Sequence, residues 1–216
     1  SANHTKTRFL ANMSHDIRTP INGILGMLTI VDTCRDNKDK MDDCLAKIDV
    51  SAKHLLSLVN DVLDMTKLER DTFTLESKPF NLDRVCIETA EIVRFQAESA
   101  GLHVEEEHPD VRNVNLLGSE LYLKKILLNL FSNCIKYNKP GGAIYTRMRE
   151  LEHTDDTVTY EFFIRDTGVG MTQDFIDNHL FEAFTQGDNA ARSQYGGTGL
   201  GMSIVAQLVK KMNGTI

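Results

Sequence analysis

The sequence of 216 residues lacks several features that would assign it to particular classes of protein. It has no lysine- or arginine-rich run, and its formal net charge of −7 argues against a general nucleic-acid surface. Its four cysteines form no CxxC pair and no cluster with histidine, which favours reduced thiols over a disulfide framework or a metal centre. We see no secretory signal, no apolar run of membrane-spanning length and no internal repeat, and therefore expect a soluble chain.

Two apolar stripes with helical spacing lie within the first 70 residues, in a chain with 41% hydrophobic and 25% charged residues overall. The first stripe is Leu10, Met13, Ile17, Ile21, Ile24, Leu28 and Val31, and the second is Met41, Leu45, Ile48, Ala52, Leu55, Val59, Val62 and Met65. The polar segment TCRDNKDKMDD between them predicts a turn, and hence a hairpin of two long helices. Two helices cover such stripes poorly, so we expect a homodimer that completes a four-helix bundle.

The segment LANMSHDIRTPING, residues 10 to 23, places a histidine, an aspartate and a proline on the first helix. His15 follows Met13 by two residues, about 200° around the helix, and therefore points away from the apolar stripe. Taken alone it is most simply a solvated surface histidine. Pro20 removes one backbone hydrogen bond and is expected to bend the helix.

The character of the chain changes after residue 70, where DTFTLESKPFNL contains a proline and no heptad pattern. We predict a linker over 71–80 and an α+β or α/β sandwich over 81–216. Helices are expected at 82–99 and 119–137, with Ser119 as an N-cap, and a last helix covers 204–212. The segments HVEEE, NVNLL, AIYTRMRE and TVTYEFFIRD read as strands, the last two joined by a polar turn.

The predicted helix at 119–137 contains the segment NLFSNCIKY. Asn129 and Asn133 are four residues apart and share a face, and Lys136 follows three residues later. An amide oxygen is a suitable ligand for Mg²⁺, and a lysine balances phosphate charge. Polar residues on a helix surface explain this segment about equally well.

Two glycine-rich segments, DTGVGM and YGGTGLGM, follow. Asp166 ends a predicted strand and is able to accept a hydrogen bond from an exocyclic amine such as that of adenine, and the glycines after it allow close approach of a flat ligand. YGGTGLGM precedes a helix, where exposed backbone amides and the helix dipole favour a polyphosphate, with Arg192 nearby. It is neither a Walker A loop nor a dinucleotide fingerprint.

The order of these segments resembles the sensor histidine kinases of two-component signalling over essentially the whole chain. SHDIRTP matches their phosphoacceptor box, NLFSNCIKY their N box, DTGVGM their first glycine box, LFEAF their F box and GGTGLGM their second glycine box. The resemblance implies a dimerisation and histidine-phosphotransfer hairpin over 1–70. It implies an ATP-binding domain of the gyrase type, an α/β sandwich, over 81–216.

For the hairpin, the resemblance implies that His15 is the phosphorylated nucleophile. Asp16, where the family usually has glutamate, would act as general base on the other ring nitrogen. Thr19 matches the position associated with dephosphorylation of the partner. These three residues are the expected catalytic set.

For the second domain, the resemblance implies that Asn133 binds Mg²⁺, supported by Asn129, and that Asp166 holds the adenine amine. The full ATP-binding set that it implies is Asn129, Asn133, Lys136, Tyr137, Asp166, Gly168, Gly170, Arg192, Gly197, Thr198, Gly199, Leu200 and Gly201. Phe181 and Phe184 match the F box and are expected to pack the lid. Cys134 and Tyr137 replace the commoner alanine and phenylalanine without removing a needed group.

The leading hypothesis is therefore an ATP-dependent kinase that autophosphorylates His15 and passes the phosphoryl group to an aspartate in the receiver domain of a response regulator. The alternatives are a core that acts mainly as a phosphatase of that regulator, a non-catalytic dimeric scaffold that binds ATP, and a gyrase-type ATPase. The family continues with another strand after MNGTI, so we expect a C-terminally truncated nucleotide domain. We expect the cytoplasmic portion of a bacterial inner-membrane protein, attached only through segments absent from this chain.

Overall fold

The computed structural model describes residues 2–34, 37–70, 72–107, 110–185 and 198–216. The chain divides into two compact units, Ser1–Arg70 and Asp71–Ile216. None of the described helices is long and apolar enough to cross a membrane.

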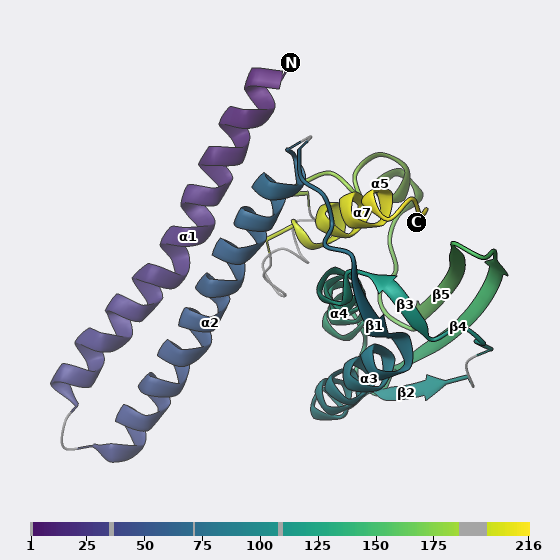
Figure 1. The fold of residues 1–216 in the computed structure, drawn as a ribbon. Coiled ribbons are helices and arrows are strands. Elements are labelled where there is room, and N and C mark those ends of the chain that lie inside the picture. The colour runs from purple at the N-terminus through teal and green to yellow at the C-terminus, as the bar shows by residue number, and fades with distance from the viewer. Residues whose placement is uncertain (1, 35–36, 71, 108–109, 186–197) are drawn as a thin grey trace. The chain divides into compact units, whose positions relative to one another are not determined.

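The first unit is the predicted helical hairpin. Figure 1 shows two long helices side by side, α1 (Ala2–Thr33) and α2 (Lys38–Leu68). The connection is shorter than the polar segment indicates, because α2 already begins at Lys38. Its N-cap is Asn37, whose side chain accepts a hydrogen bond from the backbone N–H of Lys40 at 3.1 Å. Helix α1 runs through Pro20 without ending.

Only part of the two apolar stripes is covered within the hairpin. Ile48 and Leu55 of the predicted α2 stripe are half-buried and Met65 is buried, whereas Leu45 and Val59 are exposed. A larger set of apolar side chains on the hairpin is exposed in the same way: Ile21, Leu25, Leu28, Leu45, Val50, Leu56, Val59 and Leu63. Two helices alone leave this apolar surface in water, because each contacts only one neighbour.

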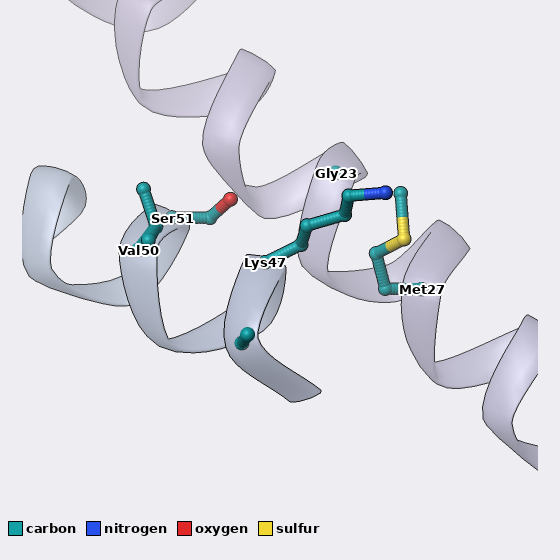
Figure 2. Close-up of a pocket in the computed structure, with 6 residues that line it drawn as sticks. Gly23, Met27, Lys47, Val50 and Ser51 are labelled. Carbon is teal, nitrogen blue, oxygen red and sulfur yellow. The ribbon is translucent and has the colours of Figure 1, made fainter. Parts of the chain in front are cut away.

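An open groove of about 380 Å³ lies between the two helices of the hairpin. Figure 2 shows side chains from both helices around it, and the residues that line it are Gly23, Met27, Ala46, Lys47, Val50 and Ser51. The lining is mostly apolar, so the groove extends the exposed apolar surface of the hairpin.

The second unit packs helices against strands. Among its described residues, the helices are α3 (Leu82–Ser99), α4 (Glu120–Lys136), α5 (Gln173–Asn178) and α7 (Gly201–Lys211). Strands β2 (His103–Glu106), β4 (Ala143–His153) and β5 (Val158–Asp166) form one sheet in the order β2-β4-β5. In it β2 is parallel to β4, and β4 is antiparallel to β5.

The predicted linker differs from the structure at its C-terminal end. Strand β1 (Lys78–Asn81) begins within 71–80 and pairs antiparallel with β3 (Asn115–Gly118). Strand β1 leads directly into α3, because its last residue, Asn81, is also the N-cap of that helix. The other predicted helices and strands of this unit are present, but α7 begins at Gly201, three residues before the predicted helix, and β4 extends to His153. Ser119 stands at the N-cap of α4, as predicted, without a side-chain capping hydrogen bond.

The core of the second unit lies between its helices and the three-stranded sheet. Val93 and Ala97 of α3, Leu127 and Phe131 of α4, and Ile144 of β4 form its centre. On α7, the buried residues are Ser203, Ile204, Val205 and Leu208. Helix α4 packs against both α3 and α7, so one face of α4 is held in the core while its C-terminal turn lies beside the end of β5.

Candidate functional site

The first group of predicted residues lies on α1. The side chain of His15 is 80% exposed, as its position opposite the apolar stripe predicts. Its Nδ1 lies 3.2 Å from Oδ1 of Asp16, whose side chain is 29% exposed. The ring nitrogen nearer the backbone is thereby engaged, and Nε2 is directed away from that pair. An exposed, oriented imidazole of this kind suits nucleophilic attack.

Thr19 lies one turn after His15 and is also exposed. Its hydroxyl donates to the backbone carbonyl of His15 at 3.1 Å. The three expected catalytic residues therefore share one exposed stretch of α1.

The second group surrounds the C-terminal end of α4. The turn after β5 is attached there, because the backbone N–H of Val169 donates to the carbonyl of Tyr137 at 3.1 Å. Gly168 approaches the same carbonyl so closely that a Cβ at that position would lie 2.5 Å from the oxygen. The fold thus joins the predicted N box to the first glycine box and requires glycine at 168.

Asp166 ends β5 and is exposed. Its Oδ1 accepts a hydrogen bond from the backbone N–H of Gly168 at 2.7 Å, which orients the carboxylate at the start of the turn. Burial raises the pKa of the neighbouring Cys134 thiol to about 12, and the charge of Asp166 and a hydrogen bond with its carboxylate act in the same direction. An exposed carboxylate held by a local turn is suited to recognising a donor on a ligand.

Lys136 and Tyr137 also lie together at this end of α4. The ammonium of Lys136 is 4.7 Å from the centroid of the Tyr137 ring. Such a cation–π contact is weak at a partly exposed site, so the lysine is able to exchange it for a phosphate.

Asn129 is brought to the first turn of α7. Its Oδ1 lies 3.8 Å from the position that a Cβ of Gly201 would occupy. Its Nδ2 is buried and has no hydrogen-bond partner among the described residues. A buried donor beside a helix N-terminus suits an acceptor on an anionic ligand. Asn133 is half-buried one turn further along α4.

The described part of the second glycine box lies against the F box. The backbone N–H of Phe184 donates to the carbonyl of Gly199 at 2.9 Å, and a Cβ on Gly199 would lie 2.9 Å from backbone atoms of Phe184. Gly199 has φ +66°, and the hydroxyl of Thr198 accepts from the N–H of Leu200 at 3.0 Å. Phe181 is exposed. Arg192 and Gly197 lie outside the described residues.

Sequence reasoning missed two residues that the structure places in this region, Asn138 and Thr167. Both side chains belong to a hydrogen-bonded network between the end of α4 and the end of β5. The only signals in the sequence are their positions, one directly after NLFSNCIKY and one inside DTGVGM.

The geometry defines a class of protein: a helical hairpin with an exposed histidine–aspartate pair, joined to an α/β nucleotide domain. Comparison with known families agrees. Residues 5–71 match the His Kinase A (phospho-acceptor) domain. Residues 118–216 match the histidine kinase-, DNA gyrase B- and HSP90-like ATPase family.

Relatives and solved structures extend over nearly the whole chain. It is 39% identical over 215 residues to the sensor histidine kinase GacS of Pseudomonas protegens, covering 100% of this chain and 23% of GacS. It is 38% identical over 216 residues to the signal transduction histidine-protein kinase BarA of Escherichia coli, covering 98% of this chain and 23% of BarA. The chain thus spans about a quarter of the length of these relatives.

Among solved structures, full-length ShkA in complex with AMPPNP matches with a TM-score of 0.64 and 29% identity, over 94% of this chain and 41% of that one. The histidine kinase ThkA in complex with the response regulator TrrA matches with a TM-score of 0.68 and 18% identity, over 96% of this chain and 55% of that one, which shows the fold alone. Through these two domains the chain belongs to the histidine kinase family of two-component signalling.

Proposed function

We propose that the chain autophosphorylates His15 from ATP and that the phosphoryl group then passes to an aspartate of a response-regulator receiver domain. The observation that carries this proposal is the pairing of an exposed His15 with Asp16 in the phospho-acceptor hairpin. Thr19 completes the proposed catalytic set. The domains proposed are the hairpin over 1–70, a connection after it, and the ATP-binding domain up to 216.

The chemistry of the first step follows from the two ring nitrogens. In the neutral imidazole with its proton on Nδ1, that proton is donated to Asp16 and the lone pair of Nε2 is available. Nε2 attacks the γ-phosphorus of ATP, the nitrogen–phosphorus bond forms, and the bond to the oxygen of the ADP leaving group breaks. Asp16 takes the Nδ1 proton as positive charge develops on the ring.

We propose that nucleotide binds at the end of α4. Asp166 receives the adenine amine, Tyr137 flanks the base, and Gly168 and Gly170 leave room for it. Lys136 and Asn129 face the phosphates, with Gly201 at the N-terminus of α7. Arg192, Gly197, Thr198, Gly199 and Leu200 complete the proposed set.

The residues at this site fit a magnesium ion held largely by substrate. The amide of Asn133 is a hard oxygen ligand, and Mg²⁺ typically keeps waters and phosphate oxygens as its other ligands. The buried amide nitrogen of Asn129, one turn away, has no hydrogen-bond partner within the described part of the chain, so it is available to an acceptor. Bound there, Mg²⁺ supplies charge neutralisation at the phosphates.

We also propose a homodimer formed through the hairpin. The exposed leucines of α1 and α2 and the open groove between these helices form an apolar surface that a second copy covers by completing four helices. We also propose that this chain is the cytoplasmic portion of a bacterial inner-membrane protein; the relatives that it matches are bacterial and about four times as long.

The decisive experiment incubates the chain with γ-labelled ATP and Mg²⁺, beside the variants His15→Gln and His54→Gln. His54 is an exposed histidine on α2 and is the matched control. We expect label in the wild type and in His54→Gln and none in His15→Gln, and the label is lost in acid and survives alkali. Absence of label from a wild-type chain that binds ATP contradicts the kinase proposal and favours a phosphatase or scaffold, which a phosphorylated receiver domain then distinguishes.

A further inference from the structure

Directly after β5, a side chain takes the place of the backbone in one hydrogen bond to β4. The β4–β5 ladder pairs Ile144 with Asp166 as its last register. One position further on, the backbone N–H of Thr167 donates to the carbonyl of Ala143 at 3.1 Å. The reciprocal bond, from the N–H of Ala143, goes at 2.9 Å to the hydroxyl of Thr167 and not to its carbonyl. The backbone of Thr167 is thereby free to leave the sheet directly after Asp166.

Asn138 binds the same hydroxyl from the other side. The Thr167 hydroxyl donates to Oδ1 of Asn138 at 3.1 Å, and Nδ2 of Asn138 donates to the carbonyl of Ala143 at 3.2 Å. The backbone N–H of Lys139 also donates to Oδ1 of Asn138, at 3.0 Å. Asn138 is only 7% exposed, so these groups satisfy one another in a buried position.

Gly142 leaves the space that this arrangement needs. A Cβ at that position would overlap Oδ1 of Asn138 and lie 2.7 Å from the hydroxyl of Thr167. The two side chains thus occupy a volume that only a glycine leaves open. We name Asn138, Thr167 and Gly142 the turn lock.

The turn lock is adjacent in the chain to the residues proposed to hold adenine. Asn138 follows Tyr137, whose carbonyl supports the turn at Val169, and Thr167 lies between Asp166 and Gly168. We propose, resting on the proposed function, that Asn138 and Thr167 are positioning residues that set the affinity for ATP by holding the Asp166 turn against α4. Neither residue is assigned a contact with the nucleotide.

The test compares Thr167→Val, which loses the hydroxyl, with Thr167→Ser, which keeps it, and with Thr159→Val as the matched control on an exposed position of β5. The readouts are the Kd for ATP and the KM and kcat of autophosphorylation, measured at a temperature where every variant is folded. The Tm of each variant is measured separately. We expect Thr167→Val to raise Kd and KM by about tenfold with kcat at saturating ATP unchanged, because an unfixed turn weakens binding only. Thr167→Ser and Thr159→Val stay near the wild type.

A lower Tm for Thr167→Val with unchanged Kd and KM overturns the proposal and leaves a structural role. Asn138→Ala provides a second route should Thr167→Val not fold, and the same rise in Kd is expected. In the double variant, Thr167→Val with Asn138→Ala, we expect a rise in Kd smaller than the product of the two single rises. A rise equal to that product contradicts the turn lock, because it would show that the two residues act independently. If the wild type binds ATP but is not phosphorylated, the proposed function is overturned and the Kd comparison still tests the turn lock. If the wild type binds no ATP, both the proposed function and the turn lock are overturned.

Discussion

Asp16 lies beside His15 with its Oδ1 3.2 Å from the imidazole Nδ1, on an exposed stretch of α1. The contact joins neighbouring residues and needs no long-range packing. It depends on the rotamers of two adjacent side chains on α1 and directs the imidazole Nδ1 toward a carboxylate.

Replacing Asp16 by asparagine removes the base and keeps the size of the side chain. We expect the rate of His15 autophosphorylation to fall by about a hundredfold or more, with the Kd for ATP unchanged, because proton acceptance contributes to the transfer step alone. The measurement is the initial rate of labelling at saturating ATP. Asp49→Asn, on an exposed and ion-paired position of α2, is the control and retains the wild-type rate. Equal rates for Asp16→Asn and wild type would remove Asp16 from the mechanism.

Gly168 and Gly170 make a matched pair in the turn after β5. A Cβ on Gly168 would meet the Tyr137 carbonyl at 2.5 Å, whereas Gly170 has φ +72° and open space around it. Gly170→Ala therefore costs about 1–2 kcal/mol of left-handed strain, and Gly168→Ala forces the turn away from α4 at a larger cost. We expect a larger fall in the Tm of the nucleotide domain for Gly168→Ala, measured by calorimetry. The reverse ranking would contradict the packing of this turn.

Glu150 couples stability of the second unit to pH. The backbone N–H groups of Asn113 and Arg112 donate to its carboxylate and hold its pKa below the usual range, against the effect of burial. Because the folded-state pKa is lowered, this stabilisation is present above the unfolded pKa of about 4.3 and is lost as pH falls through the folded value.

We therefore expect Glu150→Gln to lower the Tm at pH 7 and to have little effect near pH 3, where the wild type has lost the same contribution. Thermal unfolding followed by circular dichroism at both pH values measures this difference. Glu152→Gln, exposed two residues further along β4, serves as the control. A Tm deficit of Glu150→Gln that does not shrink on acidification is incompatible with the carboxylate's role.

Leu25 and Leu151 test the proposed dimer as a matched pair. They are equally exposed, at 57% and 56%, but Leu25 is on the hairpin and Leu151 on β4. Leu25→Glu places a charge in the apolar surface that a second copy covers, and we expect monomers by analytical ultracentrifugation at a concentration where the wild type is dimeric. Leu151→Glu remains dimeric. Dimers of unchanged stability in Leu25→Glu would exclude this surface from the interface.

Much of the architecture is local and therefore readable from the sequence. The helical period of α1 and α2, the outward direction of His15 and the end of α3 at Ser99, two residues before Gly101 with its φ of +71°, all depend on residues a few positions apart. The start of α2 at Lys38 is less readable, because charged residues suit both a turn and the exposed first turn of a helix. The strand β1 is still less so, since its partner β3 lies more than thirty residues away.

The nucleotide site shows the same division. The motifs indicate which residue types could bind a nucleotide, and the resemblance to histidine kinases assigns each of them a role. Only the tertiary structure places Gly168 against the carbonyl of Tyr137, and Asn129 beside the first residue of α7. It alone joins Asn138 to Thr167, because a buried hydrogen bond between residues 29 positions apart depends on how helix and sheet pack. The periodicity of the sequence indicates which face of a helix or strand is buried. Which residue packs against that face is decided by the tertiary structure.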